Sequence, residues 1–239
     1  MFKNTTTTDM MVFYAGAIGT ILVALYGPGG WWWALALAVH VTVISIFSAI
    51  IHRYYCHDAF KANPTVAFAL SLVSTAYFYS SAVQWRVMHL CHHAYSDTPK
   101  DTHTTGLKGF FGKGYTAPEA RFFKTGIRLM RDEKQAFVHE YAVLFGLGWG
   151  ALLLAINVNL FMYAFIVPIF TNHLANRVHK QFGHDGKGGS EHWWMEFICP
   201  MGGEWLHRDH HINAGRSIFS RKWYHFDPGS VIVRAIRQQ

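Results

Sequence analysis

Residues 31–57 read WWWALALAVHVTVISIFSAIIHRYYCH, an apolar stretch that ends in a pair of histidines. Residues 31–51 carry no charged side chain, and as a helix they would reach about 31 Å, enough to cross a membrane. A second apolar stretch, residues 10–26, precedes them across a short GPGG segment. The two stretches therefore predict a transmembrane hairpin. Trp31, Trp32 and Trp33 stand at its turn, where indole rings favour the membrane interface.

Two further apolar stretches, residues 138–155 and 158–176, predict a second hairpin of the same kind. The composition agrees, since 51% of the 239 residues are hydrophobic and 15% are charged, against roughly 25% charged in soluble domains. It excludes a disordered chain and a disulfide-stapled secreted domain. The alternative is that these stretches are buried helices of a large soluble core. A net charge of +7 in so apolar a chain favours loops that face the cytoplasm over nucleic-acid binding.

Histidine supplies 16 residues, and many of them are gathered in three short clusters. HRYYCH contains His52 and His57, HLCHH spans residues 89–93, and HRDHH spans residues 207–211. At this histidine frequency the pattern HxxHH arises by chance roughly 0.07 times per chain, and it occurs twice. The clusters therefore indicate a shared metal-binding function.

Helical geometry predicts how the clusters meet. In HxxHH the third and fourth residues after the first histidine lie on its face, so three imidazoles can converge on one place. His52 and His57 are about 140° apart around an α-helix, which favours two neighbouring metals over one. Eight or more imidazoles exceed the capacity of one ion, so we expect two. Imidazole suits iron, zinc, copper and nickel, and a dinuclear site beside a membrane favours iron with O₂.

The clusters can meet only at the same membrane face, which requires an even number of crossings between any two of them. The apolar residues 64–83 lie alone between the first and second clusters. We therefore predict that they form an interfacial or re-entrant segment, and that residues 52–136 and 177–239 form a cap. Residues 99–136 hold eight Lys or Arg, which places the cap in the cytoplasm by the positive-inside rule.

At HRYYCHDAF, WRVMHLCHHAYSDTPKDTH and GGEWLHRDHH the chain resembles the membrane fatty acid desaturases, specifically their Δ9 acyl-CoA and acyl-lipid branch, which includes the stearoyl-CoA desaturases. The three boxes occur in the family's order, and the tail SIFSRKWYHFDPGSVIVRAI is similar to its Trp/Phe-Asp-Pro ending. The resemblance runs from about residue 31 to the C-terminus. It implies an all-α membrane protein with four transmembrane helices under a cytoplasmic cap, formed by one domain, residues 1–239.

The resemblance also implies a set of site residues. Nine histidines would hold two iron ions: His52, His57, His89, His92, His93, His179, His207, His210 and His211. Asn176 would hold an iron-bound water. Trp85 matches a tryptophan along the family's acyl tunnel, and Arg86 stands one position from a residue that binds the substrate head group.

Other residues admit more than one interpretation. Metal-bound imidazoles usually donate their second N–H to a carboxylate, and Asp97, Glu204 and Asp209 are placed for this, as are Asp58 and Asp101. Arg53 is placed to bind either a carboxylate or the substrate head. His40, inside a predicted span, either is a buried functional group or packs against another helix. Trp193 and Trp194 are typical of membrane-interface aromatics.

The leading hypothesis is an O₂-dependent fatty acyl desaturase that forms a cis double bond, with Δ9 as the expected position. Its substrate would be an acyl chain on CoA, lipid or acyl carrier protein, and its electrons would come from a ferredoxin or a cytochrome b5-type donor. A related di-iron hydroxylase of lipids or alkanes is the alternative enzyme. A non-enzymatic membrane protein that carries haem or transports metal is the alternative class.

Overall fold

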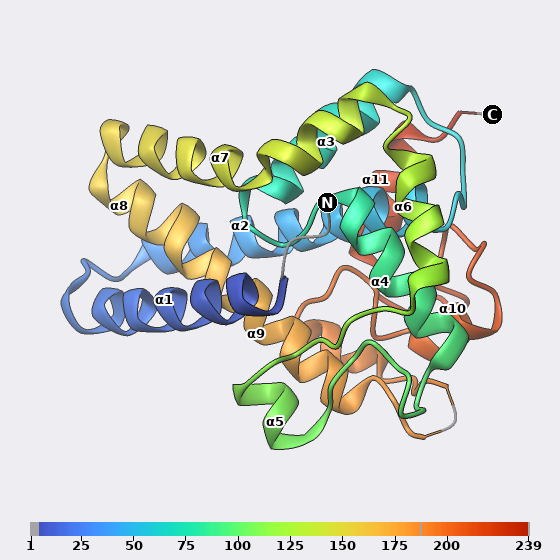
Figure 1. Cartoon of the computed structure of the whole chain (residues 1–239). Coiled ribbons are helices and arrows are strands. Elements are labelled where there is room, and N and C mark those ends of the chain that lie inside the picture. The colour runs from blue at the N-terminus through green and yellow to red at the C-terminus, as the bar shows by residue number, and fades with distance from the viewer. Residues whose placement is uncertain (1–4, 187, 239) are drawn as a thin grey trace.

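Four long helices carry the apolar stretches in the computed structural model, which describes residues 5–186 and 188–238 (Figure 1). The first hairpin pairs α1 (Thr5–Tyr26) with α2 (Trp31–Ile46), and α2 continues without a break as the π-helix η1 (Phe47–Cys56). The second pairs α7 (Glu133–Ile156) with a run made of α8 (Val158–Phe161), the π-helical η3 (Met162–Ile166) and α9 (Val167–Phe182). Within the described residues, four helices are long and apolar enough to cross a membrane. The predicted all-α fold class is confirmed.

The turns of both hairpins lie at the same end of the molecule, at the left of Figure 1. Gly29 and Gly30 form the first turn with φ angles of 68° and 63°, a left-handed conformation that glycine adopts without strain. Asn157 forms the second turn, and its side chain accepts a hydrogen bond from the backbone N–H of Asn159 at 2.8 Å. The loops and short helices of the cap gather at the opposite end.

The helices extend past the apolar stretches from which they were predicted. The second span was expected to end at residue 51, yet the helix runs through His52 to Cys56. The third begins at Glu133 instead of residue 138, and the fourth ends at Phe182 instead of residue 176. Apolar content marks the part of a helix that lies in hydrocarbon, whereas these polar ends remain helical and pack against the cap.

The apolar residues 64–83 do not form a helix long enough to cross. α3 (Pro64–Ala76) has 13 residues, or about 20 Å at 1.5 Å per residue, against roughly 30 Å of hydrocarbon. It begins at Pro64 with Asn63 as cap, whose Oδ1 accepts from the backbone N–H of Thr65 at 2.9 Å. α3 packs along α7, and the chain then turns into the cap.

The cap consists of short helices joined by long loops. Its elements are α4 (Ala82–Tyr95), α5 (Gly106–Phe111), η2 (Ala120–Phe122), α6 (Phe123–Leu129), η4 (Trp193–Phe197), α10 (His207–Ile212) and α11 (Pro228–Ile236). α4 packs on η1 and α6, and α11 packs on α2 and η1. The C-terminal end of the second span, η1, is therefore surrounded by cap elements.

Two glycines let α1 approach α9 closely. A Cβ at Gly16 would lie 3.1 Å from Cβ of Phe170, and one at Gly19 would lie 2.6 Å from Cγ2 of Ile166. Small residues at a helix crossing allow backbones to approach in this way. The contact also fixes the relative height of the two helices, with Gly16 level with Phe170.

A buried ion pair ties the first histidine pair to the C-terminal tail. Arg53 Nη1 and Nη2 donate to the two carboxylate oxygens of Asp227 at 3.1 and 2.8 Å, and both side chains are fully buried. Asp227 also accepts from the backbone N–H groups of Phe219 and Ser230. Of the two interpretations left open for Arg53, the carboxylate contact is the one that the structure shows.

We expect Asp227→Ala to lower the free energy of unfolding by about 3–5 kcal/mol, because it leaves the Arg53 charge buried without a partner. Unfolding of the purified protein in detergent, followed by circular dichroism against denaturant, measures the loss. Asp185→Ala is the matched control: its partner Arg208 is half-exposed, and such pairs contribute about 0–1 kcal/mol. Equal losses in the two variants would contradict the expectation.

Candidate metal centre

Five histidines from three elements converge on one place above the second span. Their ring nitrogens all lie within 4.8 Å of one another, and the members of this first group are His52, His57, His89, His93 and His210. Nε2 of His210 lies 2.9 Å from that of His52, 2.8 Å from that of His93 and 3.4 Å from that of His89. The first, second and third boxes therefore all contribute to the first group.

Four histidines form a second group beside the first. Its members are His92, His184, His207 and His211. Nε2 of His207 lies 2.9 Å from that of His184 and 3.0 Å from that of His211. The rings of His93 and His211 stack with centroids 4.3 Å apart, which joins the two groups. Two adjacent convergent groups agree with the expectation of two metals.

The two HxxHH boxes divide between the groups, which corrects the prediction that each converges on one place. On α4, His89 and His93 face the first group and His92 faces the second. Residues four apart on an α-helix differ by about 40°, whereas the residue three positions along lies about 60° to the other side. On α10 the division is reversed, with His210 in the first group. Each helix thus contributes histidines to both groups.

The π-helix η1 brings His52 and His57 into the same group, contrary to the prediction that they serve two metals. The backbone N–H of His57 donates to the carbonyl of His52 at 3.1 Å, an i→i+5 hydrogen bond. Wider winding brings residues five apart nearly into line, and their ring centroids are 4.9 Å apart. The 140° separation that holds for an α-helix does not apply here.

Carboxylates orient one or two imidazoles of each group. Oε1 of Glu204 lies 2.9 Å from Nδ1 of His52, and Oδ1 of Asp101 lies 2.8 Å from Nδ1 of His92. A carboxylate accepts, so Nδ1 carries the hydrogen in both rings and the Nε2 lone pair points into its group. Burial raises the pKa of Glu204, but His52, the Arg53 charge and a hydrogen bond from Ser48 together bring that pKa below its usual value.

Two other predicted carboxylates differ in their contacts. Asp97 Oδ1 lies 3.3 Å from Nδ1 of His184, so it supports the second group. Asp209 does not contact an imidazole nitrogen; instead its Oδ1 accepts from Arg221 at 2.7 Å. Asp209 is buried, and its carboxylate is paired with Arg221 and not with a histidine ring.

His179 and Asn176 lie near the groups but in neither of them. His179 Nε2 lies 3.0 Å from the backbone carbonyl of Glu204, and its ring packs edge-on against that of His207. Asn176 accepts from the Tyr115 hydroxyl at 2.8 Å and donates to the Tyr79 hydroxyl at 3.0 Å. Their roles as ninth ligand and as holder of a bound water stay predictions.

The sequence reasoning gave no role to His184, which the structure places in the second group. His184 follows α9 by two residues, and it stands five residues after His179, the same spacing as His52 and His57, which is the signal that could have marked it. His103 was also missed: its ring stacks on that of His92 with centroids 3.8 Å apart, and with Asp101 these residues form a further cluster of ligand atoms.

The groups are suited to bind metal cations. Ligands about 2.1 Å from one ion lie about 3.0 Å apart at right angles and about 3.4 Å apart in a tetrahedron, and the Nε2 separations in both groups fall in this range. Burial and neighbouring imidazoles lower the pKa of His57 and of His211 to about 2. These two imidazoles are therefore neutral at physiological pH, which is the form that ligates a metal.

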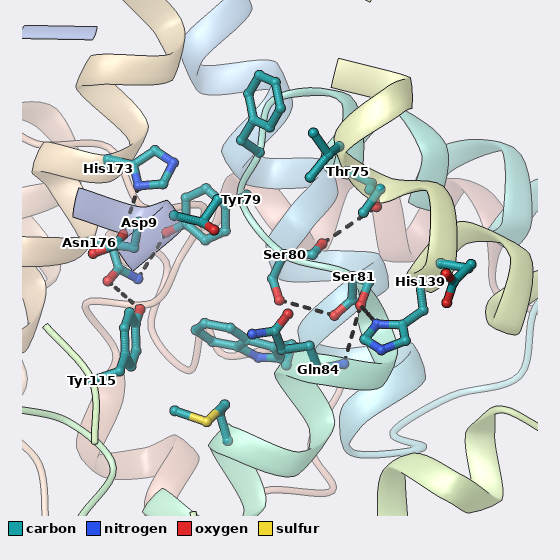
Figure 2. A pocket seen from close by; sticks show the side chains of 17 residues that line it. Asp9, Thr75, Tyr79, Ser80, Ser81, Gln84, Tyr115, His139, His173 and Asn176 are labelled. Carbon is teal, nitrogen blue, oxygen red and sulfur yellow. Dashed lines mark hydrogen bonds and ion pairs between the residues drawn. The ribbon is translucent and has the colours of Figure 1, made fainter. Parts of the chain in front are cut away.

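A cavity of about 150 Å³ lies between α1, α7, α9 and the turn that precedes α4 (Figure 2). Trp85 and Met88 line it from α4, and Asp9, His139 and His173 line it from the long helices. A smaller cavity of about 20 Å³ reaches His52, His89 and His207. Three side chains line both cavities: Tyr79, Trp85 and Asn176.

The two residues expected to bind substrate lie in different places. Trp85 lies between the cavity and the first group, since its ring stacks on that of His89 with centroids 5.2 Å apart. Arg86 points away from the cavity, and its Nη2 donates to Asp58 at 2.7 Å. Arg86 also donates to the backbone carbonyl of Tyr55, so these contacts fix it to the first box.

The fold and site define an α-helical membrane protein with two adjacent histidine groups at one end of its long helices. The sequence profile described as Fatty acid desaturase matches residues 30–238, and the chain belongs to this family. It is 32% identical to a hex-5-enoyl-[acyl-carrier protein] acetylenase of Moorena producens, over 40% of this chain and 32% of that protein. It is 31% identical to the stearoyl-CoA desaturase of Mesocricetus auratus, over 43% and 28%.

A longer and weaker similarity covers most of the chain. The sn-1 stearoyl-lipid 9-desaturase of Synechocystis is 22% identical over 91% of this chain and 73% of that protein. The chain spans only about a third of the length of the acetylenase.

Proposed function

We propose that the protein is an integral membrane enzyme that uses O₂ to form a cis double bond in a fatty acyl chain. The observation that carries this proposal is that the cavity adjoins the smaller cavity at the histidine groups, with Tyr79, Trp85 and Asn176 as their shared wall. A chain that enters beside α1 and α7 reaches the first group only past these side chains. Family membership supports the reaction class.

We propose iron at both groups, held by the five histidines of the first and the four of the second. Bound iron would supply the O₂ chemistry that removes two hydrogens from adjacent carbons. Each turnover takes one O₂, two electrons, two protons and the two chain hydrogens, and it releases two waters. The electrons come from a ferredoxin or a cytochrome b5-type donor.

The chain's own residues position the substrate and the ligands. The aromatic rings of Tyr79 and Trp85 confine an acyl chain next to the first group and exclude water, and such positioning decides which carbon reacts. Glu204 and Asp101 hold His52 and His92 in the tautomer whose Nε2 lone pair faces inward. Burial keeps the rings of His57 and His211 neutral and ready to bind.

The position of the double bond and the acyl carrier belong to the same proposal. We propose Δ9, supported by the 9-desaturases among the similar proteins. The carrier is CoA, a lipid or acyl carrier protein, which appear in the names of the similar Mesocricetus, Synechocystis and Moorena proteins respectively. We place the cap, residues 52–136 and 177–239 of a single domain, in the cytoplasm, supported by its basic residues.

We expect cells that express the protein with a ferredoxin partner to accumulate a new cis-monounsaturated fatty acid. Gas chromatography with mass spectrometry of the total fatty acids, after derivatisation that locates the double bond, measures it. Hydroxylated chains in place of alkenes would contradict desaturation and indicate a di-iron hydroxylase. An unchanged profile from protein that holds two irons per chain would also overturn the proposed reaction, whereas a Soret band would indicate a haem protein.

A further inference from the structure

The segment that precedes the third histidine box lies against the membrane-spanning part of α2, far below the metal centre. The contact farthest from the metal centre is made by Pro200, whose carbonyl lies 3.2 Å from Nε2 of His40. His40 stands 12 residues before His52, which is about 18 Å along a helix. From Pro200 the chain runs along α2 toward the metal centre. A Cβ at Gly202 would lie 2.8 Å from the carbonyl of Ile44, and the Glu204 carboxylate contacts His52.

An independent contact gives the same depth. The Thr171 hydroxyl lies 3.0 Å from Nδ1 of His40, and its neighbour Phe170 is level with Gly16 of α1. Gly16 follows the start of the apolar span at Thr8 by eight residues, or about 12 Å of helix. Pro200 therefore lies at a depth where the surrounding helices are inside hydrocarbon.

The side chains on the outer face of this segment are apolar and exposed. Trp194, Phe197 and Ile198 are 47%, 66% and 70% exposed, and Ile198 is two residues from Pro200. Residues 193–201 contain one charged residue, Glu196, and its side chain is buried, at 1% exposed. Phe197 stacks on Phe226 at 5.2 Å, which extends the apolar face toward α11.

The backbone of the segment is irregular, yet many of its polar groups are paired inside the protein. The Glu196 carboxylate accepts from the N–H groups of Met201 and Gly203 at 2.9 and 2.7 Å. The Cys199 carbonyl accepts from the Trp205 indole, and the Pro200 carbonyl accepts from His40. Non-helical backbone at membrane depth is tolerated only when its polar groups are satisfied in this way.

We propose that residues 193–201 re-enter the membrane beside α2, with Trp194, Phe197 and Ile198 in contact with the acyl chains of lipid. The proposed occupant of this face is lipid, because the segment contacts the spanning helix α2 at His40, and Leu37, one turn away on α2, is itself 58% exposed. The prediction that Trp193 and Trp194 are interface aromatics agrees with this position. The inference rests on the four spans and is independent of the proposed reaction.

Fluorescence quenching in vesicles tests the depth of the segment. Phe197→Cys is made in a Cys199→Ser background, in which the remaining cysteines, Cys56 and Cys91, are buried. The full-length protein, labelled with the polarity-sensitive dye NBD, is reconstituted in phosphatidylcholine and phosphatidylglycerol. Leu147→Cys, on the exposed side of α7, is the control for hydrocarbon, and Lys124→Cys, on α6, is the control for water.

We expect doxyl-labelled lipids to quench the label at position 197 as strongly as at 147, and iodide to quench it at least about fivefold less than at 124, because hydrocarbon excludes the anion. Ile198→Cys should give the same result, which keeps the test valid if one variant does not fold. Quenching by iodide equal to that at 124 would overturn the inference. Protection from both quenchers would also overturn it, since protein and not lipid would then cover the face.

Discussion

Replacement of His210 by alanine is expected to abolish formation of the unsaturated product and to remove iron from the first group. Nε2 of His210 lies within 3.4 Å of the same atom in three other histidines, so it occupies the centre of the group. Loss of an outer-shell partner alone typically costs about 10–100-fold in metal affinity or activity, so loss of a ligand should cost at least about 100-fold. Fatty acid analysis and iron content per chain measure the two effects.

The experiment needs a histidine whose loss leaves the groups intact. His192 lies outside both groups, and its backbone N–H, which alanine retains, donates to the carbonyl of Trp205. We expect His192→Ala to keep wild-type iron content and product yield. His92→Ala should behave as His210→Ala does, through the second group. Full activity in either of these two variants, with normal insertion, would show that the ligand assignment is wrong.

The second large effect distinguishes two candidates for the ninth ligand. We expect His184→Ala to remove about half of the bound iron and to lower product yield at least about 100-fold, because the second group then keeps three imidazoles. Its Nε2 lies 2.9 Å from that of His207, and Asp97 and Ser96 approach its Nδ1 from the other side. Iron analysis of the purified protein and product analysis in cells measure the result.

His179→Ala is the matched comparison, because His179 was the ninth ligand that the sequence predicted. Among the contacts of the described residues, His179→Ala removes the one with the Glu204 carbonyl and the packing against Trp205 and His207. We therefore expect it to keep both irons, with a fall in yield of a few fold from misplaced neighbours. Retained iron in His184→Ala together with lost iron in His179→Ala would reverse the assignment.

The sequence predicted the fold and most members of the histidine groups, but it did not predict how these histidines are divided between the two groups. The apolar stretches predicted four long helices, and all eight histidines of the three boxes lie in the two groups. The division of each box between the groups was not predictable from one helix, because it depends on where the facing helix lies. The pairing of His52 with His57 depends on π-helical winding, which no residue type in HRYYCH signals.

His184 shows a different limit. Sequence motifs identify ligands that share an element, since their spacing repeats the period of that element. His184 reaches its group from a turn beyond α9, and its position is decided by tertiary contacts with Asp97 and His207. His179, five residues earlier and inside α9, is an equally good candidate from the sequence. The choice between them required the three-dimensional course of the chain.

The unbroken run from Trp31 to Cys56 joins the far membrane surface to the first two imidazoles of the metal centre. Such a rod, anchored by tryptophans at one end, adjusts its tilt when the bilayer becomes thicker or thinner. The far end of the rod carries His52, while its partner His210 sits on a separate element of the cap. The Nε2 atoms of these two rings lie 2.9 Å apart, and that separation depends on how firmly the cap is fixed to the second span, which the Arg53–Asp227 pair and the Glu204–His52 contact accomplish.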